Sequence, residues 1–112
     1  MEINTRKIND IIIIDVDGEI DLYNSNQLRS TVKNIISLGL TKLIINLDQV
    51  SYIDSSGVGA LIASHTELYK KNGMLCILNA KDAVEKVFEF TRLNKFFKLY
   101  KDEHTAIESL KN

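Results

Sequence analysis

The residues of this sequence best suited to chemistry are two adjacent serines, Ser55 and Ser56, within the run YIDSSGVGAL at residues 52–61. An aspartate precedes them and two glycines follow closely, where an apolar, strand-like run gives way to helical spacing. Serine hydroxyls at such a junction can cap a helix, attack a substrate or accept a phosphate from another protein.

Capping accounts for the position of the serines without any further function. Asp, Ser and Gly are all favoured at the N-cap. The side-chain oxygens of Asp and Ser accept hydrogen bonds from N–H groups that have no partner within the helix, and Gly fits the backbone conformation there. On this interpretation the hydroxyls help to begin a helix.

A nucleophilic role is disfavoured, because a reactive serine needs a base within hydrogen-bond reach. His65 lies about ten residues along the same expected helix, roughly 15 Å away, on its apolar face, and His104 belongs to the C-terminal segment. The G-x-S-x-G elbow and the GxxxxGK phosphate loop are absent, and two histidines with one cysteine at unrelated spacing form no metal-ligand set. We therefore expect a protein that is not an enzyme and carries no metal or cofactor.

A third possibility is that another protein phosphorylates one of the serines. A phosphate at the start of a helix would lie at the positive end of the helix dipole and would add a charge of about −1.5 to −2. The following helix favours docking, since a helical wheel places Gly59, Ala60, Ala63 and Ser64 on a smooth face opposite the apolar stripe. Alanine is also simply a good helix former, so this face by itself is open to either interpretation.

Composition limits the remaining classes. The 112 residues suit one domain, 45% of them are hydrophobic, and 14 Lys and Arg against 15 Asp and Glu give a net charge of −1. That balance argues against partners such as nucleic acid or an anionic membrane. The apolar run at residues 11–14 is far too short to span a bilayer, and the N-terminus lacks the order of a secretory signal. A single cysteine, Cys76, is expected to be buried, in a protein of the reducing cytosol.

The hydrophobic pattern predicts strands alternating with helices. The first two strands are expected at 2–8 and 11–16, as a hairpin that turns at Asn9-Asp10. The polar stretch 17–21 follows. A helix then begins at about Asn24, with Asn24 and Gln27 as a capping pair and Gly39 at its end. Further strands are expected at 42–47, 74–78 and 98–100. Further helices are expected from residue 58 to Asn72-Gly73, around 84–88 where Asn79 could cap, and from Asp102 onward. Alternation after the hairpin demands parallel pairing, so the sequence predicts one α/β domain with a mixed sheet packed against helices.

The motifs resemble those of a known family. Asp54-Ser55-Ser56-Gly57-Val58-Gly59 closely resembles the phosphorylation segment of bacterial anti-sigma factor antagonists, which are small STAS-domain proteins, and Gly18-Glu19-Ile20-Asp21 resembles their G-E-[LI]-D segment. NGMLCILNA and VEKVFEFTRLNKFF are similar to the family's later strand, third helix and closing Leu-x-x-x-Phe stretch. The likeness covers residues 3–110, so it implies a single STAS domain over 1–112 with four or five mixed strands and about four helices.

The resemblance also implies a function. The unphosphorylated protein would bind an anti-sigma factor that is itself a serine kinase, an ATPase of the histidine-kinase-like type, and so free a sigma factor. The kinase would phosphorylate and release the antagonist, and a serine phosphatase would reset it. By position the phosphoacceptor is Ser55, with Ser56 as the alternative. Together with the smooth helix face, the expected partner surface comprises Gly18, Glu19, Ile20, Asp21, Asp54, Ser56, Gly57, Val58, Gly59, Ala60, Ala63 and Ser64.

Within that surface Asp54 would orient the acceptor turn, and Gly57 and Gly59 would let a partner backbone approach. Two alternatives share the same domain: a STAS scaffold or accessory subunit in a stress-signalling or transport complex, and a nucleotide-binding STAS module. The absence of a glycine-rich phosphate loop argues against the second.

Overall fold

The computed structural model describes residues 1–111, and its secondary structure follows the predicted order. The elements are β1 (Glu2–Ile8), β2 (Ile11–Ile20), α1 (Ser25–Ser37), β3 (Lys42–Ile53), α2 (Ser55–Lys70), β4 (Met74–Leu78), α3 (Asp82–Phe90), β5 (Lys98–Tyr100) and α4 (Glu103–Leu110). The five strands form one sheet in the order β1-β2-β3-β4-β5, with β1 antiparallel to β2 and the other neighbours parallel. This confirms the predicted α/β fold with a mixed sheet.

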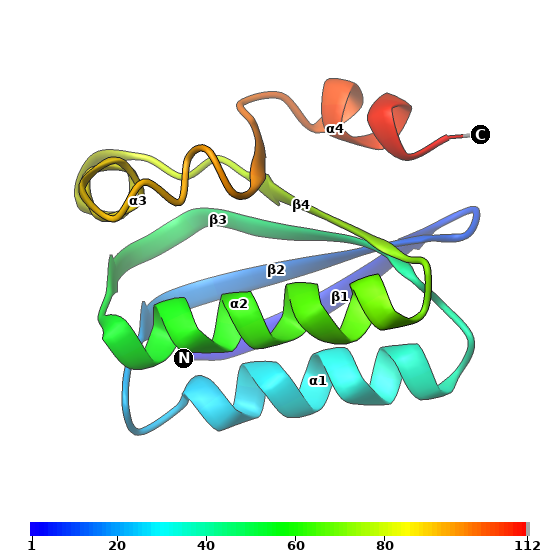
Figure 1. The fold of residues 1–112 in the computed structure, drawn as a ribbon, viewed down its shortest axis with the longest axis horizontal. Helices are drawn as coiled ribbons and strands as arrows, with labels where there is room; N and C mark the ends of the chain where they lie inside the picture. The colour runs from blue at the N-terminus through cyan, green and yellow to red at the C-terminus, as the bar shows by residue number, and fades with distance from the viewer. Residues whose placement is uncertain (112) are drawn as a thin grey trace.

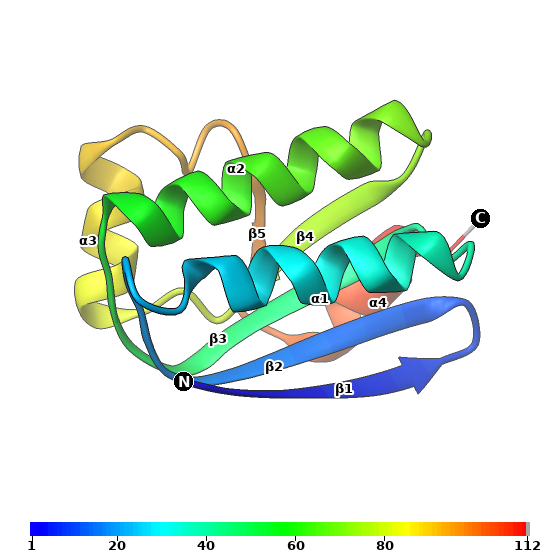
Figure 2. The same cartoon turned by 90° about the horizontal axis from the view of Figure 1, so that it is seen from below.

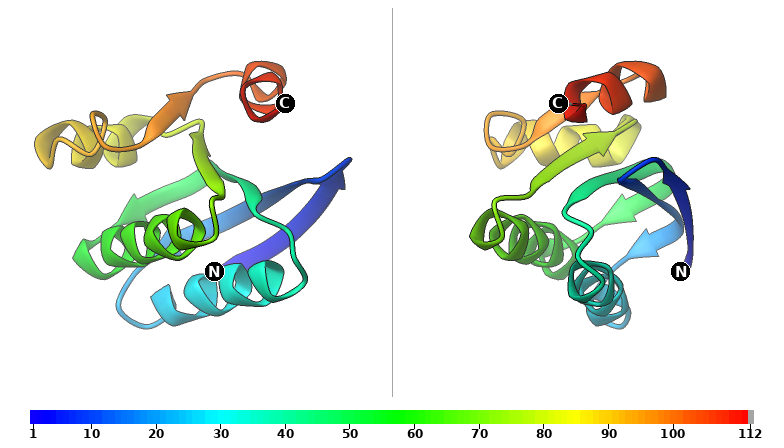
Figure 3. Two further views of the ribbon diagram at one scale, coloured as in Figure 1. Left: turned by 45° about the vertical axis from the view of Figure 1, so that its right-hand side comes forward. Right: turned by 90° about the vertical axis from the view of Figure 1, so that its right-hand side faces the viewer.

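Helices cover both faces of the sheet, which explains why β2 begins with four consecutive buried isoleucines and why β4 is buried from Leu75 to Leu78. Helices α1 and α2 lie side by side on one face, and α4 lies on the other (Figures 1 and 3). In the run IIII of β2, Ile12 and Ile14 enter the larger core beneath α1 and α2, whereas Ile11 and Ile13 enter the smaller core beneath α4. Alternate residues of a strand point to opposite faces, so each core receives every second side chain.

Two of the predicted helix ends are confirmed by their backbone geometry. Gly39 has a φ of 84°, its N–H donates to the Ile36 carbonyl, and the Leu40 N–H donates to the Ile35 carbonyl, which is a Schellman motif. Helix α2 ends in the same way, with Asn72 rather than Gly73 in the left-handed conformation at a φ of 58°.

Three local predictions are wrong. The second strand of the hairpin does not end at residue 16, because β2 continues to Ile20 through irregular pairing with β3. Asn24 makes no side-chain cap for α1, since its Oδ1 accepts a hydrogen bond from the Asp21 N–H instead. Asn79 does not cap α3 either: the N-cap is Lys81, and Asn79 has a φ of 60° in the connection from β4.

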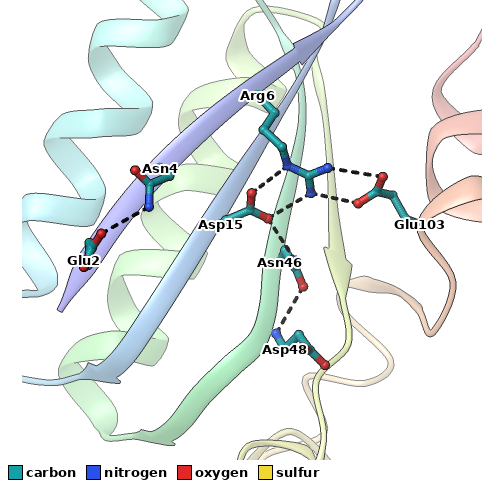
Figure 4. A network of polar contacts seen from close by, with 7 residues as sticks. All are labelled: Glu2, Asn4, Arg6, Asp15, Asn46, Asp48 and Glu103. Atoms are coloured by element: carbon teal, nitrogen blue, oxygen red, sulfur yellow. Dashed lines mark hydrogen bonds and ion pairs between the residues drawn. The ribbon is translucent and has the colours of Figure 1, made fainter.

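A polar network joins β1, β2, β3 and α4 on the face of the sheet that α4 covers (Figure 4). The Arg6 guanidinium donates to both carboxylate oxygens of Asp15, at 2.6 and 2.9 Å, and reaches Glu103 at 2.7 Å. Asn46 donates to Asp15 from the neighbouring strand. This network ties the first turn of α4 to the opening hairpin.

Candidate modification and docking site

The two serines begin a helix at the end of the sheet where the parallel strands have their carboxyl ends. Only Asp54 separates the last residue of β3 from Ser55, the first residue of α2. The β2–α1 connection and α3 lie at the same end of the molecule (Figure 2). The predicted location of the serines, on a turn between a strand and a helix, is confirmed. Open α/β sheets place their sites at this edge.

Asp54, and not a serine, caps the helix. Its Oδ1 accepts a hydrogen bond from the Gly57 N–H at 3.0 Å, and its backbone has the extended conformation of an N-cap. Within residues 1–111 the hydroxyls of Ser55 and Ser56 make no hydrogen bond to the chain, so the prediction that they help to begin the helix is wrong. Ser55 is exposed and Ser56 is half-buried.

The second carboxylate oxygen of Asp54 reaches across to the other turn of the site. Its Oδ2 accepts a hydrogen bond from the Leu22 N–H at 3.1 Å, and the Asp54 N–H donates to the Ile20 carbonyl. Pairing of Ile20 with Ile53 and of Glu19 with Tyr52 brings the two strand ends together. The G-E-I-D and D-S-S-G segments therefore form one surface.

The turn between β2 and α1 is held by its own polar side chains. Asp21 accepts a hydrogen bond from the Tyr23 N–H at 3.0 Å, and Asn24 donates to the Glu19 carbonyl at 2.8 Å. This geometry leaves Leu22 68% and Tyr23 93% exposed beside the Ser55 end of α2. Sequence reasoning missed these two apolar side chains. The closely spaced Asp21 and Asn24, which favour turns, were the available signal.

Three acidic residues belong to the two turns that meet at Ser55. Asp54 is its neighbour in sequence, and Glu19 and Asp21 belong to the turn that Asp54 contacts through Leu22. Glu19 is exposed and Asp21 is half-buried. This arrangement concentrates negative charge beside Ser55.

Part of the predicted partner surface is wrong, because four of its residues are buried. Ile20 is fully buried and Gly57 is buried, while Ala60 is 1% and Ser64 is 2% exposed. The buried side of α2 faces α1 more than the helical wheel predicts, because α2 packs against α1 as well as against the sheet. Small side chains here allow the two helices to approach closely.

The predicted role of Gly57 is therefore also corrected. A Cβ atom on Gly57 would lie 2.6 Å from the Ile20 carbonyl oxygen and 2.6 Å from a side-chain carbon of Ile53. Gly57 is needed for packing inside the protein and not for the approach of a partner. Gly59 is different, since it is exposed and has nothing within 4 Å of such an atom.

The remaining predicted residues lie at or near the surface. Gly18, Glu19, Asp21, Asp54, Ser56, Val58, Gly59 and Ala63 are exposed or half-buried. Ala63 lines the narrow seam between α1 and α2 together with Arg29 and Glu67. Within residues 1–111 the structure has no group of three or more His, Cys, Asp or Glu side chains that could hold a metal ion, and no helix long and apolar enough to cross a membrane.

The chain is similar to known proteins in sequence and in fold. The sequence profile of the family described as "STAS domain" matches residues 2–106. The chain is 30% identical over 95 residues to the anti-sigma-B factor antagonist of Staphylococcus aureus (strain NCTC 8325 / PS 47), covering 85% of this chain and 86% of that protein. It is 35% identical over 83 residues to the anti-sigma F factor antagonist of Lysinibacillus sphaericus, covering 73% of this chain and 71% of that protein.

Solved structures of SpoIIAA are similar over nearly the whole chain. The unphosphorylated form, described as an anti-sigma factor antagonist, superposes with a TM-score of 0.75 at 27% identity and covers 96% of both chains. The phosphorylated form of this Bacillus cell fate determinant superposes with a TM-score of 0.76 at 28% identity, covering 98% of this chain and 100% of that one.

Proposed function

The chain belongs to the STAS-domain family of anti-sigma factor antagonists, and we propose that it acts as such an antagonist through the surface around Ser55. In this proposal the unphosphorylated protein binds an anti-sigma factor that is also a serine kinase, and a sigma factor is set free. Phosphorylation of Ser55 by that kinase, an ATPase of the histidine-kinase-like type, releases the antagonist. A serine phosphatase restores it. Because sigma factors work with RNA polymerase, we expect the protein to act in the cytoplasm.

The observation that carries the proposal is the exposed hydroxyl of Ser55 at the first position of α2, directly after a capping aspartate. A kinase can reach an exposed hydroxyl, whereas Ser56 is half-buried. The first N–H groups of a helix have no partner within the helix, so they can accommodate a phosphate. The modification is therefore compatible with the fold.

The effect of the phosphate is expected at the interface. Glu19, Asp21 and Asp54 already make this surface acidic, and the phosphate adds a charge of about −1.5 to −2. Like charges brought together at an interface cost several kcal/mol, and each 1.4 kcal/mol is about tenfold in affinity. Loss of binding without refolding is the expected result.

Exposed residues on both sides of Ser55 complete the proposed contact. Leu22 and Tyr23 offer apolar area on one side, and Gly59 and Ile62 lie along the outer face of α2 on the other. Interfaces derive much of their energy from a few such apolar and aromatic side chains. A partner that covers Ser55 would contact both groups.

The test is to measure affinity for the cognate anti-sigma factor kinase before and after stoichiometric phosphorylation, with circular dichroism alongside. We expect affinity to fall at least about tenfold, which corresponds to 1.4 kcal/mol, with an unchanged spectrum. Equal affinity of both forms would refute the proposal.

Ser55→Ala should bind the kinase but resist release in the presence of ATP, and mass spectrometry should find no added phosphate. Ser56→Ala is the matched control and should still accept one. If Ser56→Ala alone abolishes phosphate uptake, the acceptor is Ser56.

A further inference from the structure

A cavity of about 300 Å³ lies beside the C-terminal half of α2, away from the Ser55 surface. Its lining comes from α2, the start of β4 and the segment that leads into β5: His65, Tyr69, Gly73, Met74, Leu75, Phe96, Phe97 and Lys98. Tyr69 lies fourteen positions after Ser55 along α2, which corresponds to roughly 21 Å. The cavity therefore does not belong to the surface of the proposed function.

The short length of β5 explains why this edge is open. Strand β5 pairs only with Cys76–Leu78, so Met74 and Leu75 of β4 extend beyond its first residue. The chain that enters β5 brings Phe96 and Phe97 against His65 of α2 instead of continuing the sheet. The space between α2 and this segment is the cavity.

Aromatic rings form the walls of the cavity. The centroid of His65 lies 4.8 Å from that of Phe96 and 5.8 Å from that of Phe97, and the two phenylalanine rings meet edge to face at 4.9 Å. Phe97 and Leu75 are buried and form a firm back wall. Edge-to-face contacts of this kind fix ring positions and leave ring faces available to a further apolar group.

The front wall exposes apolar surface that nothing within the described chain covers. Tyr69 is 74% exposed, Phe96 48% and Met74 38%. Apolar side chains grouped around a concave surface are typical of binding sites, and the volume lies at the small end of the range for small-molecule pockets. The shape favours a compact organic molecule.

The lysines in and next to the lining indicate the sign of the charge that such a molecule would carry. Lys98 belongs to the lining, Lys95 directly precedes Phe96, and Lys70 and Lys71 directly follow Tyr69. None of these four lysines takes part in the ion pairs found within residues 1–111. The lining contains no acidic residue. Within the lining Lys98 is therefore the group that favours an anion, since no carboxylate opposes it.

We propose that this cavity binds a small amphiphilic carboxylate, with its apolar body against Tyr69, Phe96 and Phe97 and its carboxylate towards Lys98. The site goes beyond the proposed antagonist function and is independent of Ser55. Its occupation orders exposed rings that are otherwise in contact with water.

The experiment titrates the ¹⁵N-labelled full chain with naphthoate and, as a matched neutral probe, with naphthamide, following amide shifts. We expect saturable shifts confined to residues 65–75 and 94–98, with tighter binding of the carboxylate. Tyr69→Ala and Phe96→Ala should each weaken naphthoate about tenfold, or 1.4 kcal/mol. Both side chains are substantially exposed, so these variants retain the core.

Two controls separate the parts of the proposal. Phe90→Ala removes another ring, 91% exposed on α3 and outside the cavity lining, and should leave naphthoate binding unchanged. Lys98→Gln should abolish the preference for the carboxylate over the amide.

Three results would overturn the assignment. One is the absence of saturable shifts at the cavity, and another is equal affinity for naphthoate and naphthamide. The third is a dimer in sedimentation that Tyr69→Ala converts to monomer, since the cavity would then join two copies of the chain. Each result leaves the Ser55 proposal untouched, because that is measured by kinase binding.

Discussion

At the scale of single residues, Asp54 determines the geometry around Ser55. One of its carboxylate oxygens caps α2 through Gly57 and the other holds the β2–α1 turn through Leu22. A carboxylate can do both because each oxygen accepts hydrogen bonds independently. The residue that precedes the proposed phosphoacceptor thus joins the two turns of the site.

Substitutions of Asp54 should distinguish the hydrogen bond from Gly57 from the hydrogen bond from Leu22. Asp54→Ala removes both hydrogen bonds and should lower the free energy of unfolding by about 1–2 kcal/mol. Asp54→Asn keeps one acceptor oxygen, which can still cap α2, but its amide nitrogen cannot accept from Leu22. Urea unfolding measures the stability, and hydrogen exchange of the Leu22 amide reports the second bond.

Asp102→Ala is the matched control, because Asp102 caps α4 in the same way through the Thr105 N–H. It should lower stability without faster exchange at Leu22. If exchange at Leu22 is the same in Asp54→Asn as in the unchanged protein, Asp54 does not hold the turn.

At the scale of elements, the first turn of α2 contains two glycines with opposite roles. Gly57 faces inward against β2 and β3, where a methyl group would meet the Ile20 carbonyl oxygen at 2.6 Å. Gly59 faces solvent, with nothing within 4 Å of the same atom. Glycine weakens a helix, so an exposed glycine that packing does not require points to another constraint.

Alanine substitutions should therefore have opposite effects on stability. Gly57→Ala forces backbone atoms apart and should destabilise the protein by about 1–3 kcal/mol or more. Gly59→Ala should stabilise it by about 0.5–1 kcal/mol, because alanine is the better helix former. The midpoints of urea unfolding at constant slope measure both effects.

The Gly59→Ala variant also tests the proposed interface. If a partner approaches Gly59 closely, Gly59→Ala should bind the cognate anti-sigma factor kinase more weakly even though it is more stable. A stable Gly59→Ala protein with unchanged affinity would show that the partner does not need the glycine.

At the scale of the whole molecule, Arg6 holds together parts of the chain that are distant in sequence. It joins β1 to Asp15 of β2 and to Glu103 at the start of α4. The hydrogen bonds from Arg6 hold the pKa of the Asp15 carboxyl below its ordinary value, and a hydrogen bond from Asn46 adds to this effect, while burial opposes it. Ionised Asp15 is thus favoured by the folded state.

The lowered pKa of Asp15 predicts a loss of stability in acid. A carboxylate with a depressed pKa in the folded state stabilises the protein above its unfolded pKa, about 3.9, and this contribution disappears as the pH falls through the folded value. Asp15→Asn should cost about 1 kcal/mol at neutral pH, a small effect because the pair is partly exposed to solvent. Unfolding in urea between neutral pH and strong acid measures it.

Asp17→Asn is the control on the same strand, since Asp17 is exposed and takes part in no ion pair within residues 1–111. Below pH 4 the stability of Asp15→Asn should decline less steeply than that of Asp17→Asn. Parallel curves for the two variants would mean that Asp15 does not contribute to the acid dependence.

Local interactions determined what could be predicted from the sequence. Two-residue and helical periodicities follow from backbone geometry, so strands and helices were found in the correct order. The Asp-Ser-Ser-Gly motif placed Ser55 at the start of a helix, and its exposure agrees with that position. The buried thiol of Cys76 was likewise predicted from its apolar strand.

Tertiary packing decided the rest. The sequence alone could not show that Ala60 and Ser64 face α1, because a helix with small residues on one side and large ones on the other can bury either side. Nor could it show that Asp54 reaches Leu22 across the sheet edge, or that the short β5 leaves an aromatic cavity beside α2. Propensity and periodicity act between neighbours in sequence, whereas these contacts exist only once strands and helices distant in the chain have packed together.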